Sequence, residues 1–145
     1  MTEDQLDEMG PIDYVVIEWP GEQPVGDVVP LIVDAVDRGI IRILDIAIMA
    51  KGDDGSVAAI DLGDLEDDGF AEFEGASTGL LGQEDLEEAA AALEPGTSAA
   101  VLVWENSWAG PIASALRRSG GQLVATGRIP VQAILASLDA VDAAN

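Results

Sequence analysis

The sequence predicts an α+β fold of the ferredoxin-like, split βαβ type, in which a βαββαβ antiparallel sheet is extended by a C-terminal αβα. One observation is a hairpin signal over residues 38–62, where two apolar, β-branched runs flank the turn Gly52-Asp53-Asp54-Gly55. Another is the order in which strand-like and helix-like segments follow one another. The 145 residues, 48% of them apolar, fit one domain with a sizeable core. We expect a flexible acidic N-terminus at residues 1–10 and a single domain at 11–145.

Turn-forming residues bound the first elements. A strand over residues 12–19 ends at Pro20-Gly21. A helix over residues 28–38 follows, with Asp27 as its N-cap and Gly39 at its end. The hairpin then supplies the second and third strands.

The second half of the chain begins with a long loop rich in glycine and acidic residues, over residues 63–82. A loop of this length inside a compact domain is usually functional or mobile. The later elements are a helix over 83–93, a strand over 98–105, a helix to Ser119 capped by Asn106 or Ser107, a fifth strand over 122–129, and a final helix from Pro130 to about Val141.

The final helix carries an apolar stripe at helical spacing, which must dock on another surface. That surface belongs either to its own sheet or to a neighbouring copy. The stripe is the candidate oligomer interface and consists of Val131, Ile134, Leu135, Leu138 and Val141.

Composition excludes several classes of function. With 28 acids against 6 bases, the net charge of −22 repels nucleic acids and anionic lipids. The absence of cysteine and histidine excludes thiol chemistry and a serine triad, and we expect no cofactor. We find no signal peptide and no apolar run of membrane-spanning length, so we expect a cytoplasmic protein.

The acidic motifs favour structural roles. Residues 64–69 come close to a calcium loop, but Gly75 stands where the bidentate glutamate belongs, and a solvated acidic loop is the favoured interpretation. Glu18 and Glu105 each end a strand. Because the first and fourth strands are expected to be antiparallel neighbours, these two carboxylates should lie far apart, and an acid/base pair is disfavoured.

Three charged residues interrupt apolar strands, namely Arg42, Asp45 and Arg128. One interpretation is paired structural ions on a sheet face. The other is a small anionic-ligand pocket that uses both arginines.

Four segments, residues 10–14, 37–45, 74–82 and 127–130, resemble a bacterial family of small acidic proteins of unknown function. That family is sometimes grouped with general-stress-type proteins. The resemblance covers nearly the whole chain and implies a similar fold, a bacterial origin and a stress association. It implies no catalytic residue.

Several strands are apolar on both faces, whereas an antiparallel sheet with one wet face should alternate. Both faces therefore need cover, from later helices, the 63–82 loop or another copy of the chain. We expect a non-enzymatic, self-associating protein with a structural or regulatory role. The alternative is a small-molecule binder, or a carboxylate-based enzyme, that uses the second sheet face as a pocket.

Overall fold

The computed structural model describes residues 9–21, 24, 26–65 and 69–144. The chain divides into two compact units, residues 1–115 and 116–145, where the sequence predicted one domain over 11–145. Each unit is described by itself. None of the helices within the described residues has the length and apolar character that a membrane crossing needs.

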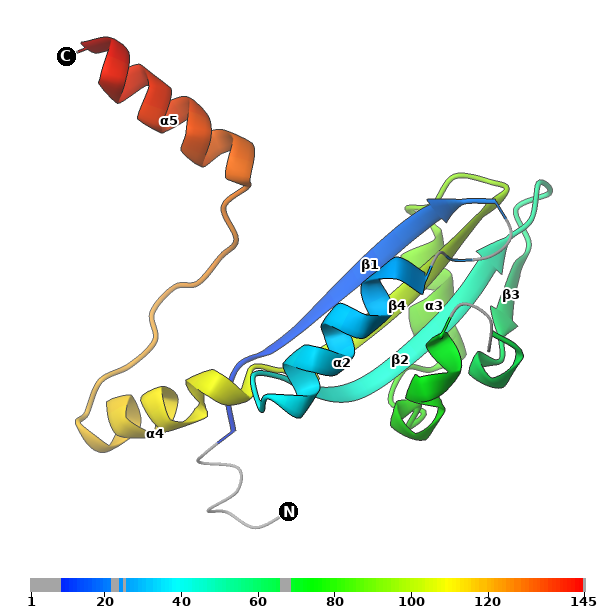
Figure 1. The fold of residues 1–145 in the computed structure, drawn as a ribbon, viewed down its shortest axis with the longest axis horizontal. Coiled ribbons are helices and arrows are strands. Elements are labelled where there is room, and N and C mark those ends of the chain that lie inside the picture. The colour runs from blue at the N-terminus through cyan, green and yellow to red at the C-terminus, as the bar shows by residue number, and fades with distance from the viewer. Residues whose placement is uncertain (1–8, 22–23, 25, 66–68, 145) are drawn as a thin grey trace. The chain divides into compact units, whose positions relative to one another are not determined.

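The first unit is built on a four-stranded antiparallel sheet with the order β1-β4-β2-β3 (Figure 1). Its strands are β1 (Ile12–Pro20), β2 (Arg42–Lys51), β3 (Val57–Ile60) and β4 (Thr97–Glu105). β4 lies between β1 and β2, so the connection from β1 to β2 skips a strand. The predicted mixed fold, antiparallel sheet and strand-to-strand hairpin are confirmed, while this strand order does not confirm a ferredoxin-like topology.

The central position of β4 explains its composition. Ser98 to Val103 are all buried, because the strand has a neighbour on each edge and helices over each face. β1, by contrast, alternates between exposed and half-buried residues, the pattern of an edge strand with one covered face.

One face of the sheet is covered by α2 (Val29–Asp37) and by the 3-10 helices η2 (Leu62–Asp64) and η3 (Phe70–Ala76). Ile46, Leu102 and Phe70 are buried at its centre. The ring of Trp19 on β1 meets Phe70 edge-on, with 5.9 Å between the ring centroids. A 3-10 turn (η1, Gly26–Val28) leads into α2, so the α-helix begins one residue later than predicted and its N-cap is Val28 in place of Asp27.

The opposite face is covered by α3 (Gln83–Ala90), and Figure 1 shows α2 and α3 on the two sides of the sheet. Leu86 and Ala90 of α3 pack on Met49 and Val101. The two-sided cover predicted from the apolar strands is therefore present within the first unit.

The segment predicted as a loop over residues 63–82 contributes to the core. Phe70 and Phe73 of η3 are 1% and 5% exposed, and Leu65 is 3% exposed. Part of the candidate calcium loop at 64–69 lies outside the described residues. Among those that are described, no group of three or more Asp or Glu side chains could hold a metal ion.

The last elements of the chain fall on both sides of the boundary between the units. η4 (Ser107–Ala109) precedes α4 (Gly110–Arg118), which crosses the boundary between the units, and α5 (Val131–Ala144) ends the described chain. Residues 121–130 form neither helix nor strand, so the predicted fifth strand over 122–129 is wrong for the single chain. A strand exists only when it is paired, and no strand of the described chain pairs with this segment.

Candidate functional site

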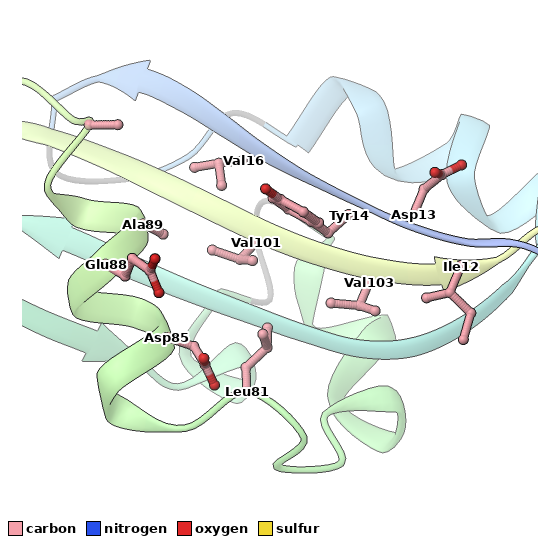
Figure 2. A pocket seen from close by; sticks show the side chains of 11 residues that line it. Ile12, Asp13, Tyr14, Val16, Leu81, Asp85, Glu88, Ala89, Val101 and Val103 are labelled. Atoms are coloured by element: carbon pink, nitrogen blue, oxygen red, sulfur yellow. The ribbon is translucent and has the colours of Figure 1, made fainter. Parts of the chain in front are cut away.

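An open groove of about 530 Å³ lies on the α3 side of the sheet, next to β1 (Figure 2). Its floor is formed by β1 and β4 through Tyr14, Val16, Val101 and Val103. α3 and the residues before it supply a wall that includes Leu81, Asp85, Glu88 and Ala89. The groove exists because α3 covers β2 and β4 but leaves β1 open on this face.

The β1 side chains that face the groove are poorly covered. Ile12 is 51% exposed, Tyr14 73% and Val16 36%. They alternate with Val15 and Trp19, which pack into the core on the other face. An apolar row on one face of a strand is expected to be covered, so this row indicates a binding surface.

The outer edge of β1 is also open, since β4 is the only strand that pairs with β1 in the described part of the chain. β1 is nine residues long, has no bulge in its pairing with β4, and carries proline only at its last position. Its central residues 14–17 are uncharged. Natural edge strands are usually short, charged or bulged to prevent pairing. β3, the other edge strand, has only four residues, so β1 is the edge that can accept another strand.

Three charged side chains hold the ends of α3 against the sheet. Asp45 accepts hydrogen bonds from the backbone N–H groups of Thr78 (2.9 Å) and Leu81 (2.7 Å), just before the helix. Lys51 Nζ donates to the carbonyl oxygens of Ala90 (2.9 Å) and Leu93 (3.0 Å), at the end of the helix. Ala90 is the last residue of α3, and a positively charged side chain is favourable at a helix C-terminus.

Glu18 completes this arrangement, because its Oε2 accepts from Glu94 N at 2.8 Å. The groove wall is thus fastened to β1 as well as to β2, through side chains that point to the same face.

Glu105 is a buried carboxylate at the end of β4, 7% exposed. It accepts hydrogen bonds from Arg42 Nε (2.8 Å) and from the N–H of Gly10 (2.9 Å). Burial by itself raises the pKa of Glu105, but the hydrogen bonds from Gly10, Arg42 and Ser107, with the charge of Arg42, hold this pKa below its ordinary value of 4.5. Through these bonds Glu105 links Gly10, near the start of the described chain, to Arg42 on β2 and to its own strand β4. It is a structural ion pair outside the groove.

The predicted anionic pocket combines Arg42 and Asp45 of β2 with Arg128 of the second unit. Arg42 pairs with Glu105, while Asp45 binds backbone N–H groups. Arg128 lies in the second unit, in the segment between α4 and α5. The shared anion site remains a prediction. Arg42 and Asp45 have structural contacts, as the alternative interpretation of these charged residues expected.

The predicted interface stripe of α5 is exposed along its length. Val131 is 68% exposed, Ile134 45%, Leu135 55%, Leu138 56% and Val141 57%. Its role as an interface remains a prediction. The carboxylates of Glu18 and Glu105 lie near opposite ends of the β1–β4 pair, opposite Ala99 and Ile12 respectively, as their antiparallel pairing predicted.

Sequence reasoning named the second sheet face as an alternative pocket, but it did not locate the groove or its lining residues. Its floor residues were recognised as apolar strand positions, but their shared exposure depends on which strand lies at the edge. The sequence of β1 is apolar on both faces, so it carried no alternation that could have marked the exposed row. Chemically, the groove offers apolar contact, the phenol of Tyr14 and the carboxylates of Asp85 and Glu88, which Figure 2 shows on the α3 side.

Comparison with known proteins gives one match. A family model described as "Family of unknown function (DUF6325)" covers residues 8–145. No curated protein and no solved structure matches the chain.

Proposed function

The chain belongs to DUF6325, a family of unknown function, and we propose that it is a non-enzymatic, self-associating protein with a structural or regulatory role. The observation that carries this proposal is β1, a nine-residue edge strand with an unpaired edge and an exposed apolar row on one face. Addition of another strand would satisfy the free backbone groups and cover the apolar row together. The stress association rests on the family resemblance.

The charge of the chain is compatible with specific association. Two copies of net charge −22 repel each other, so random aggregation is opposed. A closed assembly must bring uncharged surfaces together, and residues 14–17 of β1 form such a surface. Closed symmetric assemblies are also the common form among soluble oligomers.

The test is the mass of the full chain in sedimentation velocity at micromolar concentration. The wild type should sediment as a dimer or larger species, and Val16→Asp on β1 should shift it toward monomer. Ala58→Asp is the matched control, because it places the same charge at an exposed position of the other edge strand, β3. A wild type that stays monomeric at high micromolar concentration would overturn the proposal.

The groove supports a second candidate function, the binding of a small molecule. Its apolar floor and the carboxylates of Asp85 and Glu88 suit a ligand with an apolar body and a positive end. We expect a short alkyl amine to raise the melting temperature and the alkyl carboxylate of equal length to leave it unchanged. Val103→Trp, which should fill the floor, should abolish the shift. Equal shifts by both compounds would exclude this candidate.

A further inference from the structure

The two faces of the sheet in the first unit have cores made of side chains of different size. On the α2 side, the core includes the aromatic rings of Phe70, Phe73 and Trp19. On the α3 side, the buried core residues are Met49, Leu86, Ala90, Leu93, Ala99 and Val101. Hydrophobic stabilisation grows with the apolar area removed from water. The smaller side chains under α3 therefore contribute less to holding that helix than the rings contribute on the other face.

α3 lies between two points at which the backbone is fixed to the sheet. Before the helix, the N–H of Leu81 donates to the buried carboxylate of Asp45 at 2.7 Å. After the helix, the N–H of Gly96 donates to the backbone carbonyl oxygen of Lys51 at 2.8 Å. Gly82 directly precedes the helix, so each fixed point has a glycine, the residue with the widest range of backbone conformations. The segment between these points can therefore move as one piece while both of its ends stay in place.

The side chain of Lys51 holds the C-terminal end of this segment. Lys51 is the single lysine of the chain, and its Nζ donates to the carbonyl oxygens of Ala90 and Leu93. Both bonds have a charged donor, which makes them stronger than neutral hydrogen bonds. Glu18 adds a hydrogen bond at an exposed position, where it accepts from the N–H of Glu94. The bonds from Lys51 come from one long, flexible side chain, so they can break without disturbing the strand that carries it.

We propose that α3 is a lid, which opens from the sheet while the rest of the first unit stays folded, and that Lys51 is the latch that keeps it closed. Segments that open locally are those with little buried apolar surface. α3 has eight residues, of which two are buried. All of these contacts lie within the first unit, so the lid does not depend on the proposed self-association.

The position of the lid sets the width of the groove beside β1. Val101 lines the groove and also belongs to the core beneath α3, so the floor of the groove continues under the helix. Asp85, Glu88 and Ala89 of α3 line the groove, and Figure 2 shows this helix beside the floor. An open lid adds the apolar surface of Met49 and Val101 to the groove. The open form then admits a bulkier apolar ligand than the closed form.

Native-state hydrogen exchange of the full chain, followed by NMR at low concentrations of urea, tests the lid. The reporters are the amides of Leu86 and Ala91, which donate to the carbonyl oxygens of Gly82 and Glu87. After correction for intrinsic rates, we expect both to exchange about tenfold faster, or more, than the amide of Leu102 in the central strand β4. Their rates should also rise less steeply with urea, because local opening exposes less surface than global unfolding.

Lys51→Met tests the latch, because methionine keeps an unbranched side chain but cannot donate to the carbonyl oxygens. The amides of Leu86 and Ala91 should exchange about tenfold faster in this variant than in wild type. Lys51→Arg, which keeps the charge and the donors, should stay within about threefold of wild type. Arg38→Met is the matched control, since it removes the same charge from an exposed position at the end of α2. It should leave both rates within about twofold of wild type.

Two results would overturn the lid. Amides of Leu86 and Ala91 that match Leu102 in rate and in urea dependence would show that α3 leaves the sheet only when the whole unit unfolds. This result comes from wild type alone, so it does not depend on whether a variant folds. Unchanged rates in Lys51→Met would show that its bonds are not broken on opening and that it is not the latch. Self-association is measured separately by sedimentation, and a monomeric wild type would overturn the proposed function while the lid stands.

Discussion

At the scale of the residue, buried polar groups in this protein differ in how well they are satisfied. Glu105 accepts hydrogen bonds from Arg42 and Gly10 and lies at the junction of β1, β2 and β4. The neighbourhood of Gly10 is so close that an added Cβ would collide with the carbonyl oxygen of Asn106. Ser98 is 0% exposed, yet its hydroxyl finds no hydrogen-bond partner among the described residues.

Glu105→Gln should lower the free energy of unfolding by about 1–3 kcal/mol at pH 7, because a charge-assisted pair becomes a neutral one. The pKa of Glu105 is lowered in the folded state, so its contribution is present above the ordinary value of 4.5 and is lost as pH falls through the folded-state pKa. The difference in free energy of unfolding between wild type and Glu105→Gln, measured in urea melts, should therefore become smaller below about pH 4.5.

The matched control for Glu105 is Glu72→Gln, which changes the net charge equally at an exposed position. It should change stability by less than about 0.5 kcal/mol. The direction of the pKa shift would be contradicted if wild type and Glu105→Gln differed by the same free energy of unfolding from pH 7 to pH 3.

Ser98→Ala should stabilise the protein by up to about 1 kcal/mol, since it removes a buried hydroxyl that lacks a partner. The alanine fits the space, because it is smaller than serine. Denaturant midpoints measure the effect. A clear loss of stability would show that the hydroxyl is hydrogen-bonded in solution.

At the scale of the element, α3 depends on the sheet for its position. It has only eight residues, which is too short to be stable by itself. Two buried residues, Leu86 and Ala90, and the contacts from Asp45, Lys51 and Glu18 hold it in place. Because α3 forms one wall of the groove, these contacts determine how wide the groove is.

Asp45→Ala should release the segment before α3, because the N–H groups of Thr78 and Leu81 lose their acceptor. We expect a loss of about 2–4 kcal/mol in the free energy of unfolding, and faster hydrogen exchange at these two amides. Asp61→Ala is the control. It removes a carboxylate that caps the exposed turn at Gly63 and should lose about 1 kcal/mol. Unchanged exchange at Thr78 and Leu81 in Asp45→Ala would contradict this role.

At the scale of the molecule, charge and hydrophobic surface are unevenly distributed. Nearly all of the acidity lies in residues 1–115, whereas the most exposed apolar side chain, Val124 at 91%, lies in the C-terminal unit. In the first unit, packed elements cover both faces of the sheet except beside β1, where the groove leaves one face open. The assembly proposed here follows from that single opening.

Salt should stabilise the whole molecule. With net charge −22, screening relieves self-repulsion, so the melting temperature should rise by several degrees between low salt and about 1 M sodium chloride. Calcium chloride at equal ionic strength should add little. A flat or falling melting temperature would contradict the repulsion argument, and a saturable shift at micromolar calcium would support the loop site at residues 64–69.

Local patterns in the sequence were sufficient to predict most of the elements. The hairpin between β2 and β3 follows from its turn residues, and β4 was recognisable as a strand apolar on both faces. α5 and its apolar stripe follow from helical spacing. These features depend on residues that are near one another in the chain, so composition and periodicity reveal them.

The tertiary structure decided which surfaces remain open. Glu105 pairs with Arg42 across 63 positions of sequence, and Asp45 reaches Leu81 across 36. No local pattern specifies such partners. Residues 122–129 show the same limit of local patterns. Their alternation indicates a strand, but a strand also requires a pairing partner, which the alternation does not specify. The groove exists only because β4, and not β1, took the central position in the sheet. Strand pairing is a long-range choice among competing edges, and it is made by the packing of the whole chain.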